Sequence, residues 1–194
     1  MKITSKWMLW FMLVALYAAI FGGLVYYNMF KFVFDKKLQN EMVEMVRFRA
    51  PRLVAALAAR PKGVATFTEA DIMKSWKMND DRIKDLIYLN YDGSVRWHEN
   101  TKFLGMSYSD FNNTVGFPTN AVVYAINGRA PKAIMVEEGN TYDMAIPLLA
   151  KDAVAGVVNV TVSRAGAKAL IHSAMVRYCI GVFFMILLIG GVLY

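Results

Sequence analysis

The chain has 194 residues, of which 57% are hydrophobic, and a net charge of +7. All charged side chains except Lys2 and Lys6 lie within residues 31–177, and the segments 7–30 and 178–194 carry no charge. The basic excess is modest, and no basic run is interleaved with aromatic residues. This composition argues against a nucleic-acid-binding protein.

The two charge-free segments predict membrane helices. At about 1.5 Å of rise per residue, residues 7–30 make a helix of roughly 36 Å and residues 178–194 one of about 26 Å. A hydrocarbon core of about 30 Å needs roughly 20 apolar residues, so the first segment spans with room to tilt and the second only just spans. Residues 31–177 between them are enough for one folded domain.

The first segment is longer than the apolar region of a signal peptide, which has about 7–15 residues. Its end, residues 26–30, is too bulky for a cleavage site, so we expect an uncleaved anchor. Lys2 and Lys6 favour a cytoplasmic N-terminus, although basic residues also follow the segment. The positive-inside rule applies poorly to long loops, so we expect the domain on the extracytoplasmic side.

The domain is predicted to begin with a long helix that continues from Lys31. Pro51 is expected to kink this helix or to start a second one, and Pro61 and Gly63 are expected to end it. One apolar stripe recurs at helical spacing along it, formed by Leu38, Met42, Met45, Val46, Leu53 and Leu57. Thr68 and Asp71 resemble a capping box that opens a short helix.

Beyond Asp81 the pattern changes to β-structure. Residues 86–91 are rich in strand formers, and Asp92-Gly93 is a strong hairpin turn before a return strand over 94–98. A helical connection over 121–126 follows. Further strands are predicted at 132–136, 142–147 and 154–163, and a helix from Ala165 runs into the second apolar segment. This order predicts an α+β domain built on one antiparallel five-stranded sheet.

Two blocks of this domain resemble the extracytoplasmic PAS-like Cache domains of bacterial sensors. The first, IYLNYDGSVRWHENTKFLG over 87–105, is similar to the family's strand, acidic-Gly turn, polar strand and later Gly. The second, YDMAIPLLAKDAVAGVVNVTVS over 142–163, is similar to its two final strands around a Pro and a Gly-Val-Val. The resemblance implies a domain on the outer side of the bacterial inner (cytoplasmic) membrane, between two transmembrane helices.

The most similar variant is the single Cache domain of citrate- and fumarate-sensing histidine kinases. That variant carries Arg-x-x-His on its second strand, seven residues before the Gly, to hold ligand carboxylates. His98 matches this spacing to Gly105, whereas Arg96 precedes His98 by two residues and Val95 occupies the family's Arg position. Because side chains alternate along a strand, Arg96 and His98 are expected to point the same way and to form an anion clamp. The alternative is an exposed polar strand face.

The resemblance adds further candidate ligand-binding residues. Tyr142 and Lys132 occupy strand positions that commonly face the pocket of this fold, and Tyr108 and Arg129 come from the helical connection. The alternative for each is an ordinary place on the surface or rim of the domain.

Motifs for catalysis are missing from the sequence. It contains no G-x-S-x-G and no phosphate-binding Gly loop, and its only cysteine, Cys179, lies in the second apolar segment. A single cysteine excludes a CxxC metal site, and two histidines without a carboxylate-rich cluster do not predict one. We therefore expect no enzymatic activity, no cofactor and no metal.

Two functions remain open. The first is a membrane-anchored sensor, dimeric through its long first helix, that binds a small and in one reading anionic ligand and signals through its second membrane helix. The second is an accessory structural subunit of a larger membrane complex that has the sensor fold without sensing. In either case the expected partners are lipid and either a second copy or another membrane protein. A cavity lined by Arg96, His98 and Tyr142 would favour sensing, and one filled by Trp97, Phe103 or Met144 would favour a scaffold.

Overall fold

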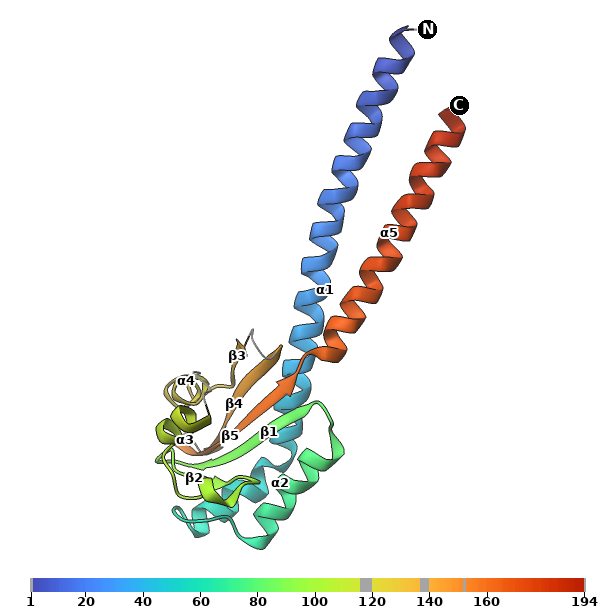
Figure 1. Ribbon diagram of the computed structural model, residues 1–194. Coiled ribbons are helices and arrows are strands. Elements are labelled where there is room, and N and C mark those ends of the chain that lie inside the picture. Colours follow the sequence, from blue (N-terminus) through green and yellow to red (C-terminus); the bar gives the residue numbers. More distant parts are fainter. Residues whose placement is uncertain (1, 116–119, 137–139, 152, 194) are drawn as a thin grey trace. The chain divides into compact units, whose positions relative to one another are not determined.

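The protein has the predicted α+β fold, with a long N-terminal helix and a five-stranded antiparallel sheet (Figure 1). The computed structural model describes residues 2–115, 120–136, 140–151 and 153–193. The elements are α1 Lys2–Ala59, α2 Phe67–Asn79, β1 Ile83–Asn90, β2 Val95–Trp97, the 3-10 turn η1 Thr101–Phe103, α3 Tyr108–Val115, α4 Ala121–Gly128, β3 Lys132–Val136, β4 Thr141–Ala150, β5 Ala153–Ser163 and α5 Ala165–Leu193. The sequence places the turn between the last two strands at Lys151-Asp152, and this turn lies partly outside the described residues.

The strand order in the sheet is β2-β1-β5-β4-β3, so β5 lies at its centre. β5 pairs with β1 from Ile83 to Asn90 and with β4 from Thr141 to Ala150. The β1–β2 pairing is short and shifts register between Tyr88 and Leu89. The C-terminal strand is therefore the one on which the rest of the sheet is built.

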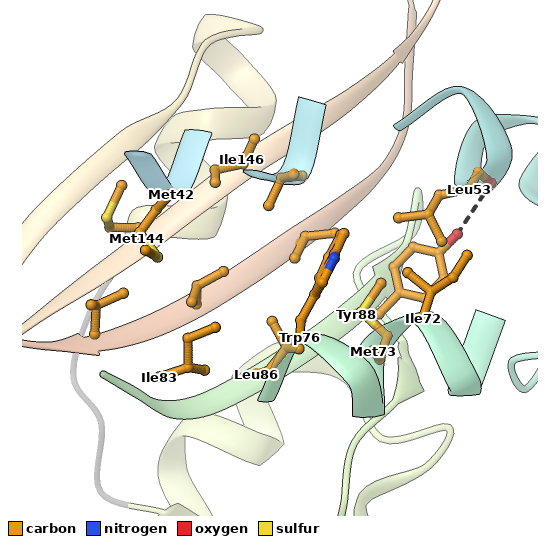
Figure 2. Packing of buried hydrophobic residues seen from close by; sticks show 14 of the residues in the cluster. Met42, Leu53, Ile72, Met73, Trp76, Ile83, Leu86, Tyr88, Met144 and Ile146 are labelled. Atoms are coloured by element: carbon orange, nitrogen blue, oxygen red, sulfur yellow. Dashed lines mark hydrogen bonds between the residues drawn. The ribbon is translucent and has the colours of Figure 1, made fainter. Parts of the chain in front are cut away.

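Each face of the sheet has its own hydrophobic core. The first face is covered by α1 and α2, and the second by α3 and α4. On the first face Met42, Met73 and Trp76 pack on strand residues such as Tyr88 and Met144 (Figure 2). On the second face Phe111 and Val122 pack on Ile87, Leu89 and Val157.

The long helix is continuous through Pro51, so the predicted second helix start is wrong. Proline removes one backbone hydrogen bond and costs a helix interior about 3 kcal/mol. The core contacts on both sides of it offset that cost, because Val46 and Leu53 are 0% exposed and Leu57 is 2% exposed. The predicted apolar stripe is confirmed, with Met45 only partly buried.

The capping box of α2 lies two residues before the predicted one. Thr66 is the N-cap, its hydroxyl accepts from the backbone N–H of Glu69, and the Glu69 carboxylate accepts from the backbone N–H of Thr66 at 2.7 Å. Both pairs have the same spacing, and Glu suits the third helical position better than Asp. Thr68 and Asp71 lie inside the helix instead.

The chain divides into two compact units: residues 1–37 with 166–194, which hold the apolar parts of α1 and α5, and residues 38–165. Stretches within Trp10–Ala59 and Ala165–Leu188 are long and apolar enough to cross a membrane. Tyr178 joins the two helices, since its hydroxyl donates to the carbonyl of Ala19 at 2.8 Å and its ring stacks on Tyr26. A Cβ at Gly22 would lie 2.7 Å from that hydroxyl. The absence of a side chain at Gly22 therefore leaves the space that the Tyr178 hydroxyl occupies.

Gly156 is the position where β5 has no room for a side chain. A Cβ there would lie 2.6 Å from the carbonyl oxygen of Leu89 and 2.8 Å from a methyl carbon of Leu57. We expect Gly156→Ala to destabilise the protein by about 1–3 kcal/mol, the usual cost of overpacking, measured by urea unfolding. Gly128→Ala is the control, because a Cβ there meets nothing within 4 Å. Equal stability of the two variants would contradict this packing.

Candidate functional site

Arg96 is completely buried on β2 and engaged by protein groups. Its Nε donates to Glu69 Oε1 at 2.8 Å and its Nη2 donates to Glu69 Oε2 at 3.1 Å. Its Nη1 donates to the carbonyl of Arg60 at 2.7 Å and to Asn90 Oδ1 at 3.0 Å. The guanidinium also lies over the ring of Tyr88, at 5.8 Å from its centroid. This geometry joins α2, the end of α1 and the β1–β2 hairpin.

The electrostatics of Glu69 agree with this structural role. Burial alone raises the pKa of Glu69, but hydrogen bonds from Arg96 and Thr66 more than offset it, so the pKa lies below its ordinary value of 4.5. Burial also raises the pKa of the neighbouring Tyr88, whose hydroxyl donates to the carbonyl of Leu53 at 3.3 Å. Glu69 is therefore an anion at neutral pH, held by the bidentate geometry that suits Arg and carboxylate.

His98 lies on the other side of the sheet from Arg96. Its Nε2 is 3.1 Å from Asp85 Oδ1, and its ring packs edge-on against Phe103 and Phe111, the latter in the second-face core. The backbone N–H of Asn100 donates to Nδ1 at 3.0 Å, which directs the Nε2 proton toward Asp85.

The prediction that Arg96 and His98 point the same way is therefore wrong. Strand alternation holds only while the strand lasts, and β2 ends at Trp97, one residue before His98. The pairing of β2 with β1 is also irregular at Tyr88.

The other predicted ligand-binding residues are dispersed. Tyr142 is buried in the first-face core with the Arg164 guanidinium over its ring at 5.1 Å, and Tyr108 is buried in the second-face core against Phe111. Lys132 is exposed, with its Nζ 5.5 Å from the ring centroid of Tyr124. Arg129 is exposed in a left-handed conformation just after α4. His98 and Tyr108 share one neighbour, Phe111, which packs against both rings.

The second face carries a group of polar side chains that the sequence analysis missed. We call this group the polar patch: Asp85 of β1, Thr141 and Asp143 of β4, and Asn159 and Thr161 of β5. Asp85 is half-buried, whereas the other four are between 2% and 7% exposed. Asp85, Thr161 and Asp143 are cross-strand partners in one row over β1, β5 and β4.

The signal for this patch was present in the sequence. Along β5, Val158, Val160 and Val162 alternate with Asn159 and Thr161. Period-two alternation gives one apolar and one polar face. The polar face of a central strand is normally solvated, yet here α3 and α4 cover it.

The hydrogen bonds within the patch are incomplete. Asn159 Nδ2 donates to Asp143 Oδ1 at 2.7 Å. Thr141 Oγ1 is buried and has no hydrogen-bond partner among the residues that the structure describes. A buried hydroxyl without a partner costs about 1–3 kcal/mol, so this position lowers the stability of the domain.

Over the described part of the chain, no three His, Cys, Asp or Glu side chains gather as metal ligands would. The sequence also places Glu137 next to Glu138, and alternation along a strand predicts that they face opposite ways and form no carboxylate pair. Both lie outside the described residues. The polar patch thus offers carboxylate, amide and hydroxyl oxygens to a small molecule.

No known protein family matches the chain, and no curated protein is significantly similar to it. Among solved structures it is similar to an extracellular ligand-binding receptor from Desulfohalobium retbaense DSM5692, with 16% identity and a TM-score of 0.42. The similarity covers 77% of this chain and 27% of the receptor, so the chain spans about a quarter of that receptor's length.

The Arg96–Glu69 pair generates a prediction about acid stability. Because the folded pKa of Glu69 is depressed, its stabilisation is complete above the unfolded value of 4.5 and is lost as pH falls through the lower folded value. Glu69→Gln leaves a buried guanidinium without its counter-charge, and we expect it to cost about 3–5 kcal/mol at pH 7.

The measurement is urea unfolding at pH 7 and at several pH values below 5. The difference between wild type and Glu69→Gln should shrink as pH falls. Glu44→Gln serves as control, because Glu44 is exposed and pairs with the equally exposed Arg47. A Glu69→Gln protein as stable as wild type at pH 7 would show that the pair is energetically neutral.

Proposed function

We propose that this protein is a membrane-anchored ligand-binding module of the sensor type. A small molecule binds at the polar patch, on the second face of the sheet beneath α3 and α4. Two apolar helices anchor the domain, and the bound state is passed on through β5 to α5.

The observation that carries this proposal is the burial of polar side chains where an apolar core would be more stable. Asp143 and Asn159 are each 2% exposed, and Thr141 is buried without a hydrogen-bond partner among the described residues. Burying polar groups costs free energy unless something compensates. A ligand that forms a hydrogen bond with the Thr141 hydroxyl supplies that compensation.

The route to the membrane is supported by the backbone at the end of β5. Only Arg164 separates Ser163, the last residue of β5, from Ala165, the first residue of α5. The N–H of Arg164 donates to the carbonyl of Asn140 at 3.0 Å, beside the start of β4. A displacement of β4 or β5 therefore reaches α5 through one residue, and the ligand biases it only through its different affinity for the two positions.

The accessory-subunit function stays as a second candidate, and one observation favours it. Trp97 is 6% and Met144 1% exposed, both inside the first-face core, while Arg96 is bonded to Glu69. These contacts are those expected of a scaffold. Dimerisation, lipid contact and a membrane-protein partner remain predictions under either function.

Ligand binding is tested by a thermal-shift screen of a metabolite library on the full chain in nanodiscs, followed by calorimetry. We expect at least one compound to raise the unfolding temperature, because a ligand that binds only the folded state stabilises it. Thr161→Val keeps the side-chain shape but removes a hydroxyl from the polar patch, and it should weaken binding of that compound. Thr101→Val, at an exposed position, should not. A screen without any stabilising compound favours the accessory subunit.

The membrane orientation is tested with the chain's single cysteine. Cys179→Ser gives a cysteine-free background, and Tyr91→Cys then places one thiol at an exposed residue of the β1–β2 hairpin. We expect a membrane-impermeant maleimide to label this thiol in intact bacterial spheroplasts, since the domain is proposed to lie outside. A second variant, Lys2→Cys, should be labelled only after lysis. The reverse pattern would place the domain in the cytoplasm.

A further inference from the structure

The unit formed by residues 1–37 and 166–194 carries basic side chains toward the end where both helices continue into residues 38–165. We call three of them the basic collar: Lys31 of α1, and Lys168 and Arg177 of α5. The only acidic residue in these two segments is Asp35, which is 7% exposed. This end of the unit therefore has an excess of positive charge.

The collar residues are not paired with other parts of the protein. Lys168 and Arg177 are exposed and Lys31 is half-buried, and none of the three has a hydrogen bond or an ion pair with another described residue. Lys37 is also basic, but it already has an interaction within the chain and is not counted in the collar. The three collar charges are thus available to an anion outside the protein.

Tyr178 fixes the register between α1 and α5, which run in opposite directions within this unit (Figure 1). Its hydroxyl donates to the carbonyl of Ala19 at 2.8 Å, and its ring stacks on Tyr26 with 5.2 Å between the ring centroids. Gly22 and Gly23 lie between these two contacts, and a Cβ at either would come within 3.2 Å of the Tyr178 side chain. Tyr178 is therefore level with the two glycines.

Aromatic side chains along α1 indicate where the two membrane surfaces would lie. Trp7 and Tyr27 are both exposed, and twenty residues separate them. At about 1.5 Å of rise per residue, this separation is roughly 30 Å, the thickness of a hydrocarbon core. Trp and Tyr are enriched at both membrane–water interfaces, so Tyr27 marks the interface on the side of the collar.

This register places the two collar lysines at the depth of the lipid headgroups. Lys31 is four residues beyond Tyr27, a distance of about 6 Å along the helix. Lys168 is ten residues before Tyr178, about 15 Å, which brings it within about 3 Å of the level of Lys31. The headgroup region extends roughly 5–7 Å beyond each side of the hydrocarbon core, so both ammonium groups lie where lipid phosphates lie. Lys36, about 14 Å beyond Tyr27, is on the water side of that region.

Arg177 is closer to the hydrocarbon than the two lysines. It precedes Tyr178, so it is level with Gly23, about 5 Å on the apolar side of Tyr27. A charge in the apolar region is costly, and a long Arg side chain lowers that cost by extending toward the interface. A guanidinium at the interface can donate two parallel hydrogen bonds to one phosphate group.

From these observations we propose that the basic collar binds the phosphate groups of anionic phospholipids. The inference rests on the proposed membrane anchoring and names the class of lipid that the anchored helices select. A zwitterionic lipid has the same phosphate, but its ammonium group is repelled by the collar, so selection depends on the net charge of the headgroup. Each Lys or Arg near an anionic surface strengthens binding by about fivefold.

The test is native mass spectrometry of the full chain released from nanodiscs that hold equal amounts of phosphatidylglycerol and phosphatidylcholine. We expect wild type to retain phosphatidylglycerol over phosphatidylcholine by at least about fivefold. The collar variant, with all three collar residues replaced by Gln, should lose most of this preference. A matched control removes the same charge from exposed positions within residues 38–165 and should keep the preference: Arg52→Gln, Lys74→Gln and Lys102→Gln.

Smaller variants decide the matter if the collar variant does not enter the nanodiscs. Arg177→Gln should lower the preference by about fivefold, whereas Arg177→Lys keeps the charge and should lower it less. Lys31→Gln combined with Lys168→Gln should lower it more than Arg177→Gln does. A full preference for phosphatidylglycerol in all of these variants would overturn the collar.

Equal retention of both lipids by wild type would overturn the inference, and so would an equal loss of preference in the collar variant and the matched control. Inorganic phosphate, added in excess and compared with chloride at the same ionic strength, distinguishes the lipid from the free ion. Loss of bound phosphatidylglycerol in phosphate but not in chloride would show that the collar is a site for free phosphate instead.

Alkaline carbonate extraction of membranes tests the anchoring separately. A wild-type protein that resists extraction but does not select phosphatidylglycerol would remove the lipid inference and leave the proposed anchoring standing. A wild-type protein that is extracted would overturn both. We expect wild type and the collar variant to stay in the membrane fraction, because the apolar segments rather than the collar supply most of the anchoring.

Discussion

The pairing of β5 with both β1 and β4 is the constraint on which the rest of the domain depends. In a strand that is paired on both sides, alternate side chains point to opposite faces of the sheet. A register shift of one residue would move every side chain to the other face. In β5, Val158, Val160 and Val162 lie on the face that α1 and α2 cover, while Asn159 and Thr161 lie on the face that α3 and α4 cover. Gly156 lets Leu57 and the backbone of Leu89 approach the same strand. The register of β5 therefore fixes both the first-face core and the polar patch.

Two buried polar groups in this domain have different physical characters. Arg96 and Glu69 form a closed set, in which the guanidinium and the carboxylate are held by protein groups from α1, α2 and the hairpin. Breaking either partner leaves a buried charge, so such a pair fixes geometry more than it adds net stability. The polar patch is an open set, since Thr141 has no hydrogen-bond partner within the described residues. A ligand can add a hydrogen bond only where a polar atom, such as the Thr141 hydroxyl, still has none.

Covalent continuity connects this patch with the apolar helices. Asn159 and Thr161 are on the strand that ends at Ser163, and α5 begins at Ala165. The interior of a domain is close-packed, so its elements shift between discrete arrangements rather than deform gradually. Tyr178, bonded to Ala19 and seated against Gly22, shows that α5 also has a specific contact with α1 within the apolar unit.

Much of the fold follows from local sequence signals. The apolar stripe of α1, the Asp92-Gly93 turn and the strands of the sheet were predicted from periodicity and turn chemistry, because these depend on neighbours in the chain. The exceptions are instructive: Pro51 lies inside a continuous helix, and Thr66 caps α2 in place of Thr68. Core contacts on both sides of Pro51 offset the cost of a proline inside the helix. The Thr66–Glu69 pair forms the capping box in place of Thr68 and Asp71, because Glu suits the third helical position better than Asp.

The candidate site could not be obtained in the same way. The sequence determined that Arg96, His98 and the alternating polar residues of β5 exist, and that charge is excluded from the two apolar segments. Only the tertiary structure decided that Arg96 pairs with Glu69 from a helix 27 positions earlier, while His98 turns to the opposite face. It also decided that α3 and α4 cover the polar side of β5. Burial and ion pairing between distant segments depend on which helices and strands pack together in the tertiary structure. Local periodicity in the sequence does not determine that packing.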